Sequence, residues 1–299
     1  MERKSKRREV ILVGGGPACC SAAIQLVRSN KNILLITKEI GGLVKNANLV
    51  ENLLGFSKGI RGEEYVSMMK EQLKETKVPV VIDEVKKVKK IEDHFVITTS
   101  NEEFFSDYVI IGSGTIPRKL QIQGEKKAYQ NRKLFYDVYE AKAYLEKNDD
   151  VIIVGGGDAA YDYALNISDQ VKQIRILQRS EKAKCLPLLL NRVRKKKYIQ
   201  IIKNFTPSEI SFYSNKLVLS VKRSPKKFVD LLTDKILVAI GRIPNIFFIE
   251  EGLLTSDNLQ STNPRLVLIG DVKNKRFRQI SIAIGDGLKE AMKIIEENE

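Results

Sequence analysis

Two glycine-rich turns stand at equivalent places in two similar segments of the sequence. An apolar run ends at Val13 and a Gly-x-Gly-x-x-small pattern begins at Gly14, and the pattern recurs from Gly155. Its last position, which must be small for helix–strand packing, is Cys19 in one copy and Ala160 in the other. Such a turn lets the backbone and a helix N-terminus approach a pyrophosphate, so the sequence predicts two dinucleotide-binding sites. The contacts that we expect are Gly14, Gly16, Pro17, Ala18, Gly156, Gly157, Asp158, Ala159 and Ala160.

The residue that follows the next strand of each copy selects the nucleotide. An acidic residue at this position binds ribose hydroxyls, whereas an arginine favours a 2′-phosphate. In the first copy, either Glu39 or the Thr37 hydroxyl could face a ribose. In the second copy the strand runs into Arg179 and then Lys184, and this basic edge predicts NADPH, with NADH left possible. The contacts expected here are Thr37, Lys38, Glu39, Gln178, Arg179, Ser180 and Lys184.

The elements that must position these turns are short apolar strands with helices between them. Strands are predicted at 10–13 and 33–36 around a first helix, and at 151–154 and 174–177 around a second. Four-residue runs of Val, Ile and Leu are typical of parallel strands that are buried on both faces. The sequence therefore predicts an α/β fold with two doubly wound, Rossmann-like domains.

Glycine and proline mark two places where the chain passes from one domain to the other. They cluster at 114–117 and again at 241–245. We therefore predict a nucleotide-binding domain of residues 114–245, inserted into a domain formed by residues 1–113 and 246–299. The C-terminal domain segment ends in an amphipathic helix that opens at Gln279 and Ile280. The free N–H groups at that end of the helix favour negative charge.

Composition excludes several classes of protein. The chain has 299 residues and no run of about 18 apolar residues that could span a membrane. Its cysteines, Cys19, Cys20 and Cys185, form no CxxC pair, so we expect structural thiols in a cytoplasmic protein. The single histidine, His94, is expected at the surface, and no metal-binding cluster is present.

The net charge of +14 has three explanations. One is a solvated, lysine-rich surface, and another is attraction of an acidic protein partner. Nucleic acid is the least favoured, because the basic runs lack interleaved aromatic residues and any known binding motif. We therefore expect no nucleic-acid partner.

Taken together, these motifs resemble those of the thioredoxin-reductase-like FAD flavoproteins over essentially the whole chain. The segments 41–43 and 51–56 are similar to the family's GGQ…ENxPGF, with Leu43 in place of glutamine, and 112–114 to its ATG turn. Gly270-Asp271 and Arg278-Gln279 are similar to its GD…RQ signature. The resemblance implies that Asp271 binds FAD and that Gln279 and Ile280 lie beside the flavin. The further cofactor contacts that we expect are Gly42, Leu43, Asn52, Val85, Gly112, Gly114, Gly241, Arg242, Gly270 and Arg278.

One feature of thioredoxin reductases is missing. The two cysteines of their redox disulfide fall on Val138 and Ala141 in this sequence. The ferredoxin–NADP+ reductases of the thioredoxin-reductase type also lack this pair, and the segment 155–165 resembles their GGGDSAxDWAL helix. The resemblance implies a homodimeric, FAD-dependent NAD(P)H oxidoreductase that exchanges electrons with ferredoxin or flavodoxin. Because the cofactors carry such chemistry, no catalytic side chain is expected.

Three other functions remain open at this stage. A thioredoxin-reductase relative without its own disulfide could act as an NAD(P)H oxidase. It could also reduce disulfides of other molecules. A redox-inactive flavoprotein could serve as a sensor or binding module.

Overall fold

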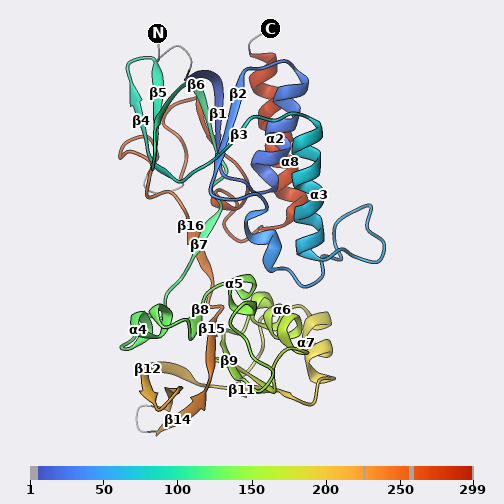
Figure 1. The fold of residues 1–299 in the computed structure, drawn as a ribbon, viewed down its shortest axis with the longest axis vertical. Coiled ribbons are helices and arrows are strands. Elements are labelled where there is room, and N and C mark those ends of the chain that lie inside the picture. The colour runs from blue at the N-terminus through green and yellow to red at the C-terminus, as the bar shows by residue number, and fades with distance from the viewer. Residues whose placement is uncertain (1–5, 225–226, 256–258, 298–299) are drawn as a thin grey trace. The chain divides into compact units, whose positions relative to one another are not determined.

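Parallel apolar strands packed with helices form the centre of both units of this protein. The computed structural model describes residues 6–224, 227–255 and 259–297. Unit 1 comprises residues 1–45, 49–116 and 243–299, and unit 2 comprises residues 46–48 and 117–242. The chain passes from one unit to the other and back along two paired strands, β7 (Thr115–Pro117) and β16 (Arg242–Pro244) (Figure 1).

The sheet of unit 1 is centred on β1, which lies between β2 and β6 and is parallel to both. β3 extends the sheet beyond β2, β17 pairs with β6, and β5 and β4 add two antiparallel strands at the other edge. The strands are β1 Arg7–Val13, β2 Ile33–Thr37, β3 Val80–Ile82, β4 Val85–Ile91, β5 His94–Thr99, β6 Glu103–Ile111 and β17 Leu266–Leu268.

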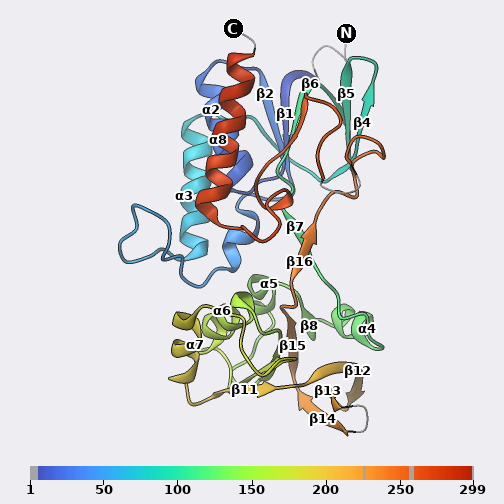
Figure 2. The same ribbon diagram turned by 180° about the vertical axis from the view of Figure 1, so that it is seen from behind.

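Three helices cover one face of this sheet, as Figures 1 and 2 show from opposite sides: α2 (Pro17–Arg28), α3 (Gly62–Glu75) and α8 (Ile280–Glu296). Two short 3-10 helices, η1 (Gly42–Asn46) and η2 (Gly270–Val272), lie in the connections. Val10 and Leu12 of β1 pack beneath the helices, whereas Ile11 and Val13 belong to the core on the opposite face. Burial on both faces explains why the run 10–13 is wholly apolar.

Helices α2 and α8 approach each other closely because small residues meet at their crossing. A Cβ atom at Gly287 would lie 2.0 Å from the Ala18 carbonyl oxygen. Ala22 of α2 and Ala291 of α8 are fully buried in the same cluster. Protein interiors are close-packed, so a larger residue at Gly287 would separate the two helices.

Unit 2 contains a five-stranded parallel sheet in the order β11-β10-β9-β15-β8. Its strands are β8 Leu134–Phe135, β9 Asp150–Val154, β10 Gln173–Gln178, β11 Ile199–Lys203 and β15 Lys235–Val238. Its helices are α4 Glu125–Gln130, α5 Val138–Lys142, α6 Asp158–Ile167 and α7 Pro187–Arg194. The predicted α/β class with two Rossmann-like units is confirmed by this strand order and by the structural comparisons reported below.

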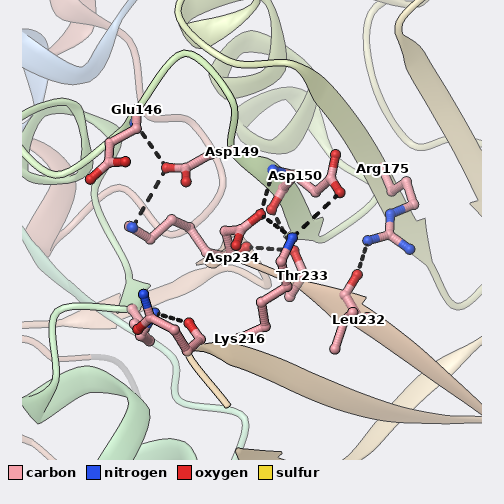
Figure 3. Close-up of polar contacts among 11 residues, drawn as sticks. Glu146, Asp149, Asp150, Arg175, Lys216, Leu232, Thr233 and Asp234 are labelled. Carbon is pink, nitrogen blue, oxygen red and sulfur yellow. Dashed lines mark hydrogen bonds and ion pairs between the residues drawn. The ribbon is translucent and has the colours of Figure 1, made fainter. Parts of the chain in front are cut away.

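A three-stranded antiparallel sheet completes unit 2: β12 (Thr206–Tyr213), β13 (Lys216–Ser224) and β14 (Lys227–Thr233). A polar network joins it to the amino ends of β9 and β15 (Figure 3). Lys216 Nζ lies 2.9 Å from Asp234 Oδ2, and Thr233 Oγ1 donates to the Asp150 carbonyl at 2.7 Å. Burial raises the pKa of Asp234, but the Asp150 N–H and Lys216 outweigh it and hold that pKa below its usual value.

Cys19 and Gly112 fill one space in the core of unit 1. Cys19 is fully buried, and a Cβ atom at Gly112 would lie 2.4 Å from its sulfur. The same Cβ would lie 3.6 Å from Cys19 Cβ, which is an ordinary contact.

Gly112→Ala is therefore expected to lower the free energy of unfolding by about 1–3 kcal/mol through overpacking. In a Cys19→Ala background, where the sulfur is gone, the same substitution should cost less, so the two changes are non-additive. Urea unfolding of the four proteins of this double-mutant cycle measures the coupling. Additive costs would show that the sulfur and residue 112 do not share one space.

Candidate dinucleotide-binding sites

The glycine turn of unit 1 packs backbone against backbone on one side and leaves open space on the other. Gly14 has a φ of +120°, and a Cβ there would lie 2.3 Å from the Gly112 oxygen. At Gly15 a Cβ would lie 2.1 Å from the Glu39 oxygen. Gly16, in contrast, has no heavy atom within 4 Å of its Cβ position. The turn thus needs glycine for its own packing and presents Gly16 to open space.

Helix α2 begins directly after this open position. Its N-cap, Gly16, is extended and makes no side-chain capping hydrogen bond, and Pro17 occupies the first helical position. The first N–H groups of a helix lack partners within the helix, and its dipole favours an anion at this end. The geometry at Gly16, Pro17 and Ala18 therefore fits a pyrophosphate.

The end of β2 separates the two residues that were considered for the ribose. Thr37 is buried, and its hydroxyl donates to the Glu39 carbonyl at 2.8 Å, so it stabilises the turn. The Glu39 carboxylate is about half exposed and is held by Lys45 Nζ at 2.5 Å. Lys38 points elsewhere, to Glu84 at 2.6 Å. Of these residues, Glu39 combines an exposed carboxylate with a place in the turn, so it stays the predicted ribose contact.

Segments from three other parts of the chain lie at the same edge of the sheet. The ends of β2 and β6 are paired with the end of β1, and β17 ends beside β6. Gly42 of η1 lies over the glycine turn, with its Cβ position 3.6 Å from the Gly16 Cα. The Asn52 side-chain amide donates to Gln279 Oε1 at 2.9 Å, and this joins the segment after η1 to the start of α8. The predicted FAD contacts Gly14, Gly16, Glu39, Gly42, Asn52, Gly112, Gly270 and Gln279 are therefore gathered from distant parts of the sequence.

The remaining residues predicted for this site occupy different positions. Leu43 is half-buried in η1, and Gly114 has a φ of +66° with open space at its Cβ position. Asp271 and Arg278 are both half-buried, in η2 and in the loop before α8. Val85 begins β4 and packs against the hydrophobic cluster on the sheet face away from the helices. Ile280 is the first residue of α8, whose N-cap Gln279 makes no side-chain capping bond.

Asp286 was not among the predicted residues, yet it holds the Gly270–Asp271 turn in place. From α8, its carboxylate accepts the Gly270 N–H at 3.0 Å and the Asn274 side-chain amide. Gly270 needs a positive φ of +68° and approaches Ala18, where its Cβ position lies 2.9 Å from the Ala18 Cβ. The sequence signal was an acid between two glycines, Gly285 and Gly287, in the C-terminal helix.

The second glycine turn, in unit 2, repeats the same physical arrangement. Gly155 has a φ of +156°, and its Cβ position lies 2.4 Å from the Ala239 oxygen. Gly157 is open, with only the Lys184 oxygen at 4.0 Å from its Cβ position. Helix α6 follows without a side-chain cap, and its residue Ala160 is fully buried, which satisfies the small position of the pattern. A second anion site is therefore available at Gly157, Asp158 and Ala159.

The loop that follows β10 is tied to this turn. Lys184 N donates to the Gly156 oxygen at 2.7 Å, and the Asp158 carboxylate accepts the Leu186 N–H at 2.7 Å. Asp158 therefore holds the loop, so its side chain is engaged inside unit 2. Gly156 lacks room for a side chain because its Cβ position lies 3.1 Å from Gln178 Cβ.

Gln178 stabilises the loop that carries the predicted phosphate contacts. It is only 1% exposed, and its amide oxygen accepts the Tyr161 hydroxyl at 2.9 Å while its nitrogen donates to the Ser180 carbonyl at 2.8 Å. The amide is thus used within the protein to shape the loop. Arg179 and Lys184 are exposed and form no ion pair with any residue that the structure describes.

The chain leaves the sheet of unit 2 at Gly241, whose φ is +105°. The neighbouring Arg242 lies 3.1 Å from Asp137, the N-cap residue of α5. Arg242 is therefore committed to an ion pair in unit 2. Cofactor contact at these two positions stays a prediction.

The positions of the missing disulfide are buried in the core of unit 2. Val138 and Ala141 of α5 are both fully buried and pack with Phe135 and Ile153. Cys20 is buried in α2, and burial raises the pKa of its thiol to about 12. Burial, followed by the neighbouring Cys20, also raises the pKa of Cys19. These thiols are therefore protonated and inaccessible, unlike reactive cysteines.

Residues 6–224, 227–255 and 259–297 contain neither a metal-binding cluster nor a membrane-spanning helix. Within these ranges no cluster of three or more His, Cys, Asp or Glu side chains could hold a metal ion. No helix in the same ranges is long and apolar enough to cross a membrane.

Similarity to known proteins agrees with two dinucleotide sites. Residues 8–287 match the family described as pyridine nucleotide-disulphide oxidoreductase. A thioredoxin reductase of Buchnera aphidicola (subspecies Schizaphis graminum) is 30% identical, over 98% of this chain and 97% of that protein. The thioredoxin reductase of Bacillus subtilis is 28% identical, over 95% and 92% respectively. The crystal structure of Lactococcus lactis thioredoxin reductase in its FR conformation gives a TM-score of 0.88 at 29% identity, covering 97% of this chain and 99% of that one.

Arg179→Ala is expected to weaken NADPH binding about tenfold or more, because a charge-assisted contact to a phosphate contributes about 1.5–3 kcal/mol. NADH, which lacks the 2′-phosphate, should be affected little. Dissociation constants for both nucleotides measure the effect, with Lys172→Ala, at an exposed position before β10, as the control. A wild-type protein that binds NADH as tightly as NADPH would contradict the role of Arg179.

Asp286→Ala should weaken FAD binding by about tenfold, since it removes hydrogen bonds to a charged group that are worth about 1.5–3 kcal/mol. Asp286→Asn should have a smaller effect because an amide oxygen can still accept. Fluorescence titration of the apoprotein with FAD gives the dissociation constants, and Lys289→Ala, at an exposed position on α8, is the control. Unchanged FAD affinity in a folded Asp286→Ala protein would show that the turn does not depend on this carboxylate.

Proposed function

This chain belongs to the pyridine nucleotide-disulphide oxidoreductase family, and we propose that it transfers electrons between NADPH and an acidic electron-carrier protein such as ferredoxin or flavodoxin, using FAD and no disulfide of its own. The observation that carries this proposal is the burial of Val138 and Ala141 in the core of unit 2. A disulfide relay needs two thiols that can reach the surface, and neither residue can supply one. Electrons would then have to leave the cofactor site directly.

The residues at both glycine turns fit the proposed cofactors. In unit 1, Gly16 and the start of α2 would hold the FAD pyrophosphate, and Glu39 would bind its ribose. In unit 2, Gly157 and the start of α6 would hold the NADPH pyrophosphate, with Arg179 and Lys184 at the 2′-phosphate. When bound, FAD and NADPH would supply the hydride and electron-transfer chemistry.

The start of α8 would act on the electrostatics of the flavin site. Its first N–H groups have no partner within the helix, and Gln279 is oriented by the hydrogen bond from Asn52. These dipoles stabilise negative charge at the end of the helix. A cofactor held there would become easier to reduce, because its reduced form is anionic.

The relatives are named thioredoxin reductases, which favours one alternative: reduction of a disulfide that belongs to another molecule. A direct dithiol mechanism would need a reactive cysteine near the cofactors. Cys19 and Cys20 are buried, and burial raises the pKa of both thiols. These thiols agree better with structural roles in a reducing cytoplasm, where we place the protein.

Replacing Cys19, Cys20 and Cys185 with alanine should leave NADPH-driven reduction of ferredoxin within about twofold of wild type. Cys19 and Cys20 are buried, Cys185 is half-buried, and burial raises the pKa of all three thiols, which disfavours the reactive thiolate. Wild-type protein is assayed in parallel with ferredoxin, flavodoxin, oxidised thioredoxin and oxygen. We expect reduction of a carrier protein and none of thioredoxin.

Two controls separate loss of a reactive thiol from loss of the cofactor. FAD occupancy is measured from the absorbance of each protein, because Cys19 packs beside the glycine turn and its loss could weaken cofactor binding. Reduction of a small quinone by NADPH reports whether the cofactors still exchange electrons. If a fully flavinated, cysteine-free protein no longer transfers electrons, a thiol takes part in the reaction, and the protein is a disulfide reductase.

A further inference from the structure

The loop between η2 and α8 differs from its surroundings in charge and exposure. Residues 273–278, which we call the basic loop, have the sequence Lys-Asn-Lys-Arg-Phe-Arg and lead into α8 (Figure 2). Lys273, Lys275 and Arg276 are all exposed, and none forms an ion pair with any residue in the described part of the chain. Phe277 is 62% exposed, with the Arg276 guanidinium 5.1 Å from its ring centroid.

Many other cations of unit 1 are neutralised by a neighbouring carboxylate. Lys6 pairs with Glu102, Lys45 with Glu39, and both Lys38 and Lys86 with Glu84. Lys273, Lys275 and Arg276 of the basic loop therefore concentrate positive charge that no carboxylate in the described part of unit 1 pairs with. Uncompensated charge of this kind attracts a partner of opposite charge and raises its rate of association.

Hydrogen bonds of Lys273, Asn274 and Phe277 stabilise the backbone of the basic loop. Lys273 N and Asn274 N both donate to the Gly270 oxygen, at 3.0 and 3.1 Å, and Phe277 N donates to the Asn274 oxygen at 2.7 Å. The Asn274 side chain donates to Asp286 of α8. A preordered loop loses little entropy when a partner binds, so its cations can serve as a docking surface.

The ends of the basic loop are the two segments predicted to contact FAD. Gly270 and Asp271 precede it with only Val272 between, and Gln279 follows it directly. A protein bound at Lys275 and Phe277 would therefore contact a loop that is continuous, at both ends, with residues predicted to contact FAD.

We propose that the basic loop is the docking surface for an acidic electron-carrier protein, with Lys273, Lys275 and Arg276 meeting its carboxylates and Phe277 packing at the centre. This inference rests on the proposed function and adds the place where the partner binds. An exposed aromatic residue surrounded by charge matches the composition of protein interfaces, in which aromatic residues and arginine are enriched.

The test is the triple charge reversal K273E/K275E/R276E. Its matched control is K74E/K77E/K90E, which changes the net charge by the same amount at exposed positions of unit 1 far from the loop in sequence. Binding of oxidised ferredoxin and of flavodoxin is measured by calorimetry at low and at physiological ionic strength. We expect the loop variant to bind about tenfold or more weakly at low salt, with a smaller difference at higher salt. The control should stay within about twofold of wild type.

Two further measurements locate the surface. Carbodiimide should cross-link Lys273 or Lys275 of the wild type to carrier carboxylates, as mass spectrometry identifies. Phe277→Ala, which keeps every charge, should weaken binding at both salt concentrations because the contribution of an apolar contact is not screened. Reduction of a small neutral quinone by NADPH should be unchanged in every variant.

The outcomes separate this inference from the proposed function. If wild type reduces ferredoxin or flavodoxin but the loop variant binds as well as the control, the docking surface is wrong and the function stands. Equal losses in both triple variants, or cross-links elsewhere, would also overturn the docking surface. If NADPH reduces the bound cofactor but wild type reduces neither carrier, the proposed acceptor is wrong, and the docking surface is rejected with it.

Discussion

The site of unit 1 depends on backbone segments that approach each other more closely than any side chain would allow. Gly14 lies against Gly112, Gly15 against the Glu39 carbonyl, and Gly287 against Ala18, each with a Cβ position within 2.3 Å of a backbone oxygen. These three contacts bring β1, β2, β6 and α8 to one point. The space over Gly16 is left open because all neighbouring segments are fixed around it.

The same constraint explains an exchange of volume that would otherwise be puzzling. The third position of the fingerprint is normally glycine or alanine, and the family's ATG turn has alanine where this chain has Gly112. In this chain Cys19 stands at that small position of the fingerprint. Its sulfur lies where the methyl group of an alanine at residue 112 would be. The Cys19 sulfur, on α2, thus fills the space that an alanine side chain after β6 would fill.

The sequence predicted the glycine turns, the parallel strands and the helix at Gln279 because each depends on local residue types. It could not decide whether Thr37 or Glu39 faces a ribose. That choice depends on which of the two side chains is hydrogen-bonded within the turn after β2. Gln178 was expected at the nucleotide, but the Tyr161 hydroxyl and the Ser180 carbonyl, which engage its amide, are visible only in three dimensions. Asp286 was missed for the same reason, because its partners are 12 and 16 residues away.

The loss of the disulfide changes what the surface of the protein must do. In a reductase with its own disulfide, that pair relays electrons from the flavin to the acceptor. In this chain, α5 is anchored in the core through Val138 and Ala141, so no such carrier exists. In the proposed function, an acceptor would therefore have to approach the cofactor itself, and the protein surface at the cofactor would have to recognise it. Long-range charge is suited to that task, since it orients a partner before contact without requiring a deep groove. The exposed cations Lys273, Lys275 and Arg276, on a short loop between the two segments predicted to contact FAD, are suited to this task in the proposed function.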